Sequence, residues 1–417
     1  MNKKREDIYV DMANITNPIY LITIIYIVSV SSIFINHEIK YLNWQRIFLY
    51  ITIPYVIYVL IYKFTSHKGR IKIKNDEKYN EIYISNRVYI LNFIVSIICF
   101  LLILNGIIYI ISLFGIQNVI KGVTKLEFIQ MIQQNNDKKI SLAILASNIL
   151  PITNTVLIKR IVNNNKAKRT IYGIVLSMCV LGVFIFSNLI GARVLFLYSI
   201  FGCFYIVFCN KKLNVRNLLK ILFVVLAFMG VILFMQVNKT IDEDNKLNVA
   251  KENLVNYYAK SIDNAVYIID NDYKRLNFGY WAIKPVLNIP IISSTFNLKE
   301  IYERYISNIP IKNREDDFFY VRNLGIDPEY NTISIYGYSY VDFGFYGFIM
   351  IVLQYLILQH SYYSYLKRDN VSIYMFPILY CSFLDSIRNY GLINDRVILC
   401  ILIIFLYRIV NKVKIII

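Results

Sequence analysis

The sequence predicts an all-α polytopic integral membrane protein with about ten transmembrane helices and one large external loop. The chain has 417 residues, of which 57% are hydrophobic, and its mean hydropathy is +0.49. Its apolar residues form runs of about 17 to 25, which is the length needed to cross a bilayer. Basic residues gather in short polar connections between these runs, as membrane proteins require for orientation.

The apolar runs define the individual spans. Residues 170–209 contain no charged side chain except Arg193 and extend about 60 Å as helix, which is enough for two crossings of a core about 30 Å thick. We therefore expect a turn near Gly191. The basic start is followed by a long apolar run without a cleavage site, so we expect an uncleaved first span. The predicted spans are 18–35, 47–62, 88–116, 140–158, 170–190, 192–209, 218–237, 343–362, 371–387 and 397–410.

The distribution of Lys and Arg predicts the sidedness. Alternate connections are rich in basic residues, at 3–5, 63–87, 159–169, 211–216, 367–368 and 412–414. These connections are cytoplasmic by the positive-inside rule, and so are both termini. The opposite connections contain Arg193, the segment 238–333 and the turn "RNYGLINDR".

The predicted organisation has three parts: spans in 1–237, a large external loop at 238–333 and further spans in 334–417. The loop holds 14 of the 27 acidic residues and has no low-complexity character. Apolar residues at helical spacing predict a helix over 247–270 and a second, short helix over 298–306. Between them, "WAIKPVLNIPII" is apolar with two prolines, which suits a segment lying on the bilayer.

Several function classes are disfavoured by composition. The net charge of +18 resides mainly in the short loops, so we do not expect a nucleic-acid partner. The six cysteines lie in or at the ends of apolar spans, and the three histidines are scattered, so no disulfide framework or metal site is expected. "REDDFF" at 314–319 has the wrong spacing for a metal-binding Asp-x-Asp. We expect neither cofactor nor metal.

Three arginines at external ends of spans indicate an anionic ligand. Arg193 follows the turn at Gly191, while Arg388 and Arg396 lie beside Asp385 and Asp395. A guanidinium matches phosphate oxygens with two parallel hydrogen bonds, which lysine cannot do. The alternative for Arg193 is a snorkelling side chain that only anchors a turn.

One motif resembles a known family. "NTISIYGYSYVDFGFYGF" (331–348) is similar to the junction of external loop and late span in Wzy-type oligosaccharide repeat-unit polymerases, the O-antigen and capsule polymerases. The span number and the late external loop also resemble that family. The matching residues are Asn331, Thr332, Tyr340, Asp342, Phe343, Gly344 and Gly347. Helix packing at the glycines and an interfacial tyrosine belt explain much of the motif equally well. Asp342 either caps a helix, pairs with an arginine or acts in catalysis.

The resemblance implies a metal-independent membrane glycosyltransferase at the outer face of a bacterial cytoplasmic membrane. It would transfer a glycan from one polyprenyl-pyrophosphate-linked oligosaccharide to a hydroxyl of another, making a surface polysaccharide. Such chemistry requires neutralisation of the departing pyrophosphate and a group that accepts the hydroxyl proton. The implied partners are the lipid-linked substrates, the bilayer, and a flippase and chain-length regulator of the same pathway.

Site residues follow from these tasks. We expect Asp342, ahead of Asp317 and Asp327, as the base. Substrate binding is assigned to Arg193, Arg388, Arg396, Arg314, Arg322 and Tyr340. The aromatic residues Tyr280, Trp281, Phe318 and Phe319 either stack on sugars or are simply buried.

Other functions remain open from the sequence. An O-antigen ligase-like enzyme would use the same donor and a different acceptor. Ligases of that kind resemble enzymes that use a histidine in the external loop, and this loop has none, which disfavours the ligase. A C-superfamily glycosyltransferase is expected to carry acidic residues in its first external loop, which here has only Glu38. A lipid-linked oligosaccharide flippase would show repeated halves, mid-span charges and short loops.

Overall fold

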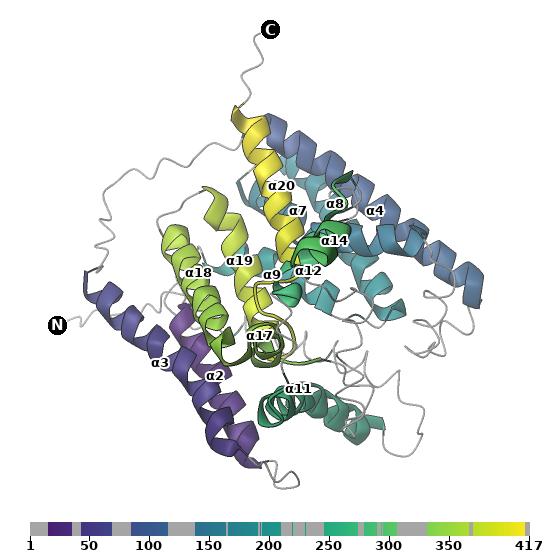
Figure 1. Cartoon of the computed structure of the whole chain (residues 1–417). Coiled ribbons are helices and arrows are strands. Elements are labelled where there is room, and N and C mark those ends of the chain that lie inside the picture. Colours follow the sequence, from purple (N-terminus) through teal and green to yellow (C-terminus); the bar gives the residue numbers. More distant parts are fainter. Residues whose placement is uncertain are drawn as a thin grey trace, which may run out of the picture.

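The computed structural model consists of helices joined by turns and loops (Figure 1). In the part of the chain that it describes there is no β-strand. The described residues are 16–35, 43–68, 85–115, 138–163, 166–190, 192, 194–209, 219, 230, 246–273, 279–289, 293, 295–306, 332–366 and 370–412. The prediction of an all-α protein is therefore confirmed for this part of the chain.

Most predicted spans coincide with helices. The helices that match predicted spans are α2 (Pro18–Ile35), α3 (Trp44–Lys68), α4 (Asn86–Phe114), α7 (Lys138–Asn163), α8 (Lys166–Leu189), α9 (Val194–Cys209), α18 (Phe348–Leu366), α19 (Asn370–Leu384) and α20 (Asp395–Lys412). The break between α8 and α9 confirms the turn expected near Gly191. The span predicted at 218–237 lies almost entirely outside the described residues.

Length and hydropathy support a membrane protein. Five helical segments are long and apolar enough to cross a bilayer: α3, α4, α7, α8 and the continuous stretch Ile335–Leu366. Three shorter apolar helices are α2, α9 and α19. The larger count of about ten spans stays a prediction.

The helices pack as two groups with separate hydrophobic cores. One group, which we call the scaffold group, is formed by α4, α7 and α8, with the start of α9 contributing Leu195 and Phe196 (Figure 1). The other core includes residues of α2, α3, α17, α18, α19 and α20. Helix α7 contacts α4, α8, α9, α19 and α20, so it joins the two groups.

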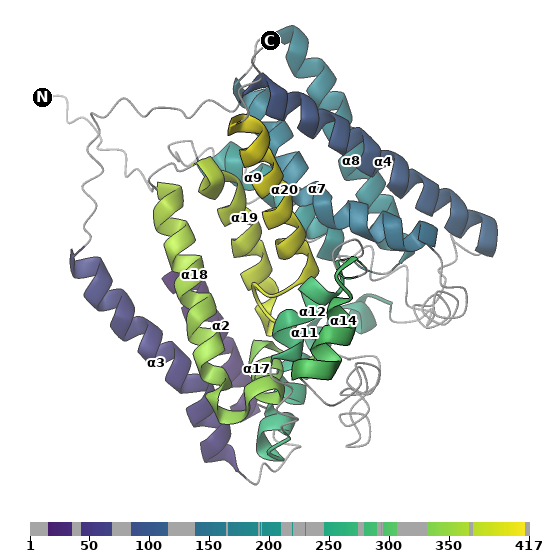
Figure 2. The same cartoon turned by 45° about the horizontal axis from the view of Figure 1, so that its top comes forward.

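The segment that the sequence predicts to be external is part of the second core rather than a separate unit. Helix α11 (Lys246–Asp270) contacts α2, α3 and α17, and its residues Ile262, Ala265 and Ile269 are buried in that core. Helix α12 (Tyr280–Leu287) contacts α17 and α20 (Figure 2). The sequence placed this stretch on the bilayer, but Tyr280, Trp281 and Leu287 are buried against protein.

Helix α17 (Ile335–Phe343) precedes α18 and is separated from it by a 3-10 turn, Gly344–Gly347. Gly344 ends α17 with φ +58°, a conformation that residues other than glycine rarely adopt. A Cβ atom at Gly347 would overlap the carbonyl oxygen of Ser339 and the hydroxyl of Tyr50. Close packing at these two glycines therefore explains part of the motif.

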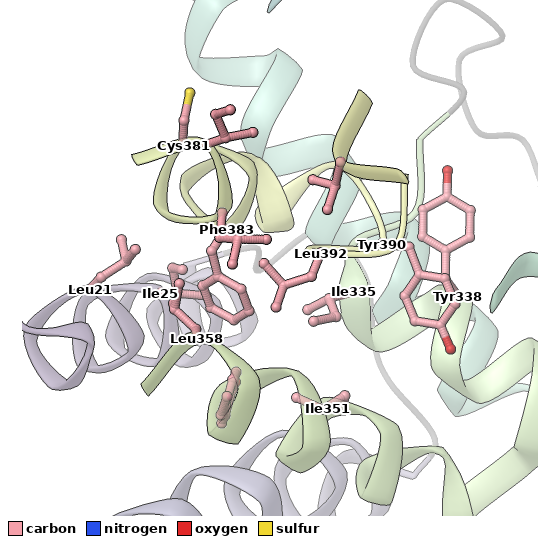
Figure 3. Packing of buried hydrophobic residues seen from close by; sticks show 14 of the residues in the cluster. Leu21, Ile25, Ile335, Tyr338, Ile351, Leu358, Cys381, Phe383, Tyr390 and Leu392 are labelled. Atoms are coloured by element: carbon pink, nitrogen blue, oxygen red, sulfur yellow. The ribbon is translucent and has the colours of Figure 1, made fainter. Parts of the chain in front are cut away.

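Helices α11, α12 and α17 gather around the turn between α19 and α20, near the bottom centre of Figure 1. We call this region the α17 end. Figure 3 shows part of its packing, with Tyr338 and Tyr390 side by side and Phe383 near Ile25 and Leu358. The short helix α14 (Leu298–Ile301) continues into a π-helical turn, Tyr302–Ile306, as the sequence predicted for 298–306.

Candidate functional site

Four of the predicted site residues lie in the described part of the chain, and all four are at the α17 end. Asp342 and Tyr340 are on α17, Arg388 is in the α19–α20 turn and Arg396 is in the first turn of α20. The predicted residues Arg193, Arg314, Asp317, Arg322 and Asp327 lie outside the described residues, as do Phe318 and Phe319.

Two arginines and two aspartates form a charged cluster at the α19–α20 turn. Arg388 Nη1 is 3.7 Å from Asp385 Oδ1, and both side chains are buried. Asn389 donates a side-chain hydrogen bond to the other oxygen of Asp385. Arg396 lies on the adjoining end of α20 and is partly buried. Asp395, the residue before Arg396, also interacts electrostatically with Arg396, so two carboxylates accompany the two guanidinium groups. A guanidinium group binds phosphate oxygens through two parallel hydrogen bonds, so the pair of arginines suits an anionic ligand.

Aromatic rings face both guanidinium groups. The Arg388 guanidinium carbon is 5.8 Å from the ring centroid of Tyr258 on α11, and that of Arg396 is 5.0 Å from the ring of Tyr198 on α9. Such contacts stabilise a cation that has lost part of its water shell. The cluster therefore lies between α9, α11, α19 and α20.

The backbone of the α19–α20 turn is fixed by polar side chains. Ser382 donates to the carbonyl oxygen of Gly391 over 2.6 Å, and Asn394 donates to both Ser382 and Gly391. Asn394 also caps α20, since its Oδ1 accepts from the N–H of Val397. Tyr390, Gly391 and Leu392 are buried, so "RNYGLINDR" is a turn inserted between helices rather than a solvated loop.

Asp342 caps a helix other than its own. Its Oδ1 accepts from the N–H of Trp281 over 3.2 Å, and its Oδ2 accepts from the N–H of Ala282 over 3.1 Å. These are N–H groups of the first turn of α12, which has Gly279 at its N-cap and no side-chain cap from that residue. Asp342 is only 1% exposed. Asp342 therefore caps a helix, but this helix is α12 and not the span that follows Asp342 in the chain, and the cap docks α12 onto α17.

The aromatic residues of α12 are packed, not open. Tyr280 is fully buried and Trp281 is 8% exposed, and the Trp281 ring lies 5.0 Å from that of Tyr338. Tyr338 in turn stacks on Tyr390 of the α19–α20 turn, with centroids 5.6 Å apart. Lys284 Nζ lies 4.4 Å from the Trp281 ring centroid. Of the two explanations offered for these residues, burial is the one observed.

Tyr340 belongs to a second polar cluster on another side of α17. Its hydroxyl donates to Asp272 Oδ1 over 2.5 Å, and the same oxygen is 3.7 Å from Arg46 Nη1 at the start of α3. Asp272 has φ +52°, and the preceding Asp270 accepts the N–H of Asn43 over 2.6 Å. This cluster ties the end of α11 to α3 and α17.

Thr332 of the motif also makes a defined contact. Its Oγ1 lies 2.5 Å from Ser261 Oγ, and its carbonyl oxygen accepts from Asn264 Nδ2 over 2.9 Å, so it holds the start of α17 against α11. The remaining motif residue of the pair, Asn331, lies outside the described residues.

Sequence reasoning missed several residues of this region, among them Arg46, Asp272, Gln354 and Ser386. Nothing local marks them, because Arg46, Asp272 and Ser386 adjoin other polar residues at the ends of apolar runs and Gln354 lies inside a predicted span. The described residues contain no group of three or more His, Cys, Asp or Glu side chains that could hold a metal ion.

Comparison with known proteins adds no relatives. No protein-family model, curated protein or solved structure matches this chain.

Proposed function

We propose that this chain is a membrane glycosyltransferase that polymerises polyprenyl-pyrophosphate-linked oligosaccharide repeat units. Its place would be the outer face of a bacterial cytoplasmic membrane, with both termini in the cytoplasm. The product would be a surface polysaccharide such as O-antigen or capsule, and no metal would be required.

The observation that carries the proposal is the pair of arginines at the α19–α20 turn. Arg388 and Arg396 lie there with Asp385 and Asp395, and each guanidinium group has a tyrosine ring beside it, Tyr258 and Tyr198 respectively. Transfer from a lipid pyrophosphate builds negative charge on the leaving group, which fixed guanidinium groups stabilise in a site of low dielectric. The motif that resembles repeat-unit polymerases packs on this turn through Tyr338 and Tyr390.

In this reaction the acceptor hydroxyl oxygen forms a bond to the anomeric carbon. The bond from that carbon to the pyrophosphate oxygen breaks, and its electron pair leaves with the lipid pyrophosphate. The hydroxyl proton passes to a carboxylate and then to water. Asp342, which belongs to the motif, accepts two backbone hydrogen bonds and so positions α12. Which of Asp342, Asp317 and Asp327 acts as the base is a question for mutagenesis.

Arginine-to-lysine variants test the proposal. We expect Arg388→Lys and Arg396→Lys to lower polymer formation about ten- to 150-fold, because lysine keeps the charge but loses the two-pronged hydrogen bonding to phosphate. The assay is polymer length from purified protein in lipid vesicles supplied with lipid-linked repeat units.

Arg160→Lys is the matched control. Arg160 also lies over a tyrosine ring, that of Tyr89 at 4.3 Å, and donates to Asn86 over 2.9 Å, but it belongs to the far end of α7. We expect this variant to polymerise normally. Full-length polymer from both Arg388→Lys and Arg396→Lys, at wild-type protein levels, would refute the proposal.

Two alternatives predict other outcomes. If the chain is a flippase, its loss should prevent single repeat units from reaching the outer leaflet. If it is a polymerase, its loss should leave single units exported but not joined. A ligase-like enzyme would transfer the glycan to a different acceptor and make no polymer from repeat units alone.

A further inference from the structure

Among the buried hydrogen-bond donors at the α19–α20 turn, three that have no bonding partner among the described residues come from three different elements. They are Nε2 of Gln354 on α18, Oγ of Ser386 in the 3-10 turn Asp385–Ile387, and Nε of Arg396 on α20. Leaving a buried donor unsatisfied is costly, and native proteins do so rarely and often where a ligand binds.

Gln354 lies directly against the turn. Its Oε1 accepts from the N–H of Leu392 over 2.7 Å, and a Cβ atom at Gly391 would lie 2.5 Å from that oxygen. Gly391 adopts φ +59°, a conformation that glycine tolerates, and its lack of a side chain lets the amide oxygen come this close. Because Nε2 belongs to the same planar amide, it is held next to the turn that carries Arg388.

Ser386 is part of the same turn. It follows Asp385, the partner of Arg388, and its side chain is fully buried. Ser386, Gln354 and Arg396 therefore present unused donors from three different elements around one short segment. Unused donors beside two guanidinium groups suit a ligand that offers several acceptor atoms, such as phosphate oxygens.

We propose that Gln354 and Ser386 bind the phosphate oxygens of the ligand together with Arg388 and Arg396. The identity of that ligand, a polyprenyl pyrophosphate, rests on the proposed function. Gln354 then has two tasks: its oxygen holds Leu392 in place, and its nitrogen donates to the anion.

The chain offers a matched control for this residue. Gln359 lies five residues further on the same helix, is also buried, and its Oε1 accepts from the hydroxyl of Tyr58 over 2.6 Å. Its Nε2 likewise has no bonding partner among the described residues, but its Oε1 bonds to α3 rather than to the α19–α20 turn. Gln354→Glu and Gln359→Glu thus introduce the same group into the same helix, and each keeps the accepting oxygen.

The experiment measures binding, not turnover. Wild type, Gln354→Glu, Gln359→Glu and Ser386→Ala are purified as full-length chains, placed in lipid vesicles, and titrated with labelled polyprenyl pyrophosphate or with inorganic pyrophosphate. We expect Gln354→Glu to weaken binding of the lipid about ten- to 100-fold, because a donor is replaced by an acceptor. Ser386→Ala should weaken it about three- to tenfold, and Gln359→Glu should bind within about threefold of wild type.

The outcomes separate this inference from the proposed function. Wild-type binding by both Gln354→Glu and Ser386→Ala, or an equal loss in Gln359→Glu, would overturn the inference. If inorganic pyrophosphate binds as tightly as the lipid, the ligand is a free anion and the lipid assignment is wrong. A chain that binds the lipid through Gln354 yet never forms polymer would refute the function while supporting this site.

Discussion

The scaffold group and the α17 end use polar side chains in different ways. In the scaffold group, hydroxyl groups mostly bond to carbonyl oxygens of their own helix, as Ser147 does to Ile144 over 2.7 Å and Ser187 does to Phe184 over 3.0 Å. At the α17 end, polar side chains join elements far apart in the chain, as Asp342 does to α12 and Gln354 does to the α19–α20 turn.

The difference is between hydrogen bonds within one helix and hydrogen bonds between elements. Bonds within one helix satisfy a hydroxyl in an apolar setting without fixing a neighbouring element. Bonds between elements hold a particular arrangement of segments, and at the α17 end they surround the buried Arg388 and the partly buried Arg396. We therefore expect substitutions at the α17 end to have larger and more specific consequences than those around α4, α7 and α8.

The largest effect is expected from Gly347→Ala. The added methyl group would overlap the backbone of Ser339, which cannot move without shifting α17, so we expect a loss of about 3 kcal/mol in the free energy of unfolding. Thermal unfolding of the purified protein in detergent measures this loss. Gly173→Ala in α8 is the control, because nothing lies within 4 Å of the added atom. Equal stability of the two variants would contradict the packing described for the 3-10 turn.

A smaller effect is expected from Asp342→Ala. The first-turn N–H groups of α12 lose their acceptor, which costs about 1 to 2 kcal/mol and loosens that helix more than the rest of the chain. Hydrogen exchange of residues 280–287 should become faster, while exchange in α4 stays as in wild type. Asp342→Asn retains one accepting oxygen and should give an intermediate rate. Unchanged exchange in Asp342→Ala would show that α12 is held by its apolar contacts alone.

The smallest effect is expected from Tyr407→Phe. The Tyr407 hydroxyl donates to Asn92 Oδ1 over 2.6 Å and so links α20 to α4, at the junction of the two groups. Hydrogen bonds between membrane helices average about 0.6 kcal/mol, so stability should fall by about that amount. Polymer formation should be unchanged, because no atom of the arginine cluster moves. A loss of activity at normal stability would extend the functional region into the scaffold group.

Local patterns in the sequence predicted the individual helices well. The span predicted at 18–35 coincides with α2, and the helix predicted at 247–270 begins one residue late relative to α11. Hydropathy and helical periodicity are properties of consecutive residues, so they can be read without knowing the fold. The same local reading placed a single helix boundary at 343, where the structure has the end of α17 and a 3-10 turn caused by Gly344 and Gly347.

The site was predictable only in part. Arg388, Arg396, Tyr340 and Asp342 were selected from the sequence, and the structure gathers them at the α17 end. Their partners were not predictable: Asp272 lies 68 residues from Tyr340, and Leu392 lies 38 residues from Gln354. No spacing rule connects such pairs, because their contact depends on how separate helices pack.

By itself, the sequence determined the helical class, the position of most spans and the unusual charges at their ends, because the cost of exposing apolar or charged groups to the wrong solvent acts on each segment independently. The tertiary structure alone decided that α12 is buried rather than lying on the bilayer, that Asp342 caps that helix, and that Gln354 holds the α19–α20 turn. These outcomes depend on hydrogen bonds and close contacts between segments distant in the chain, which form only when the helices have packed.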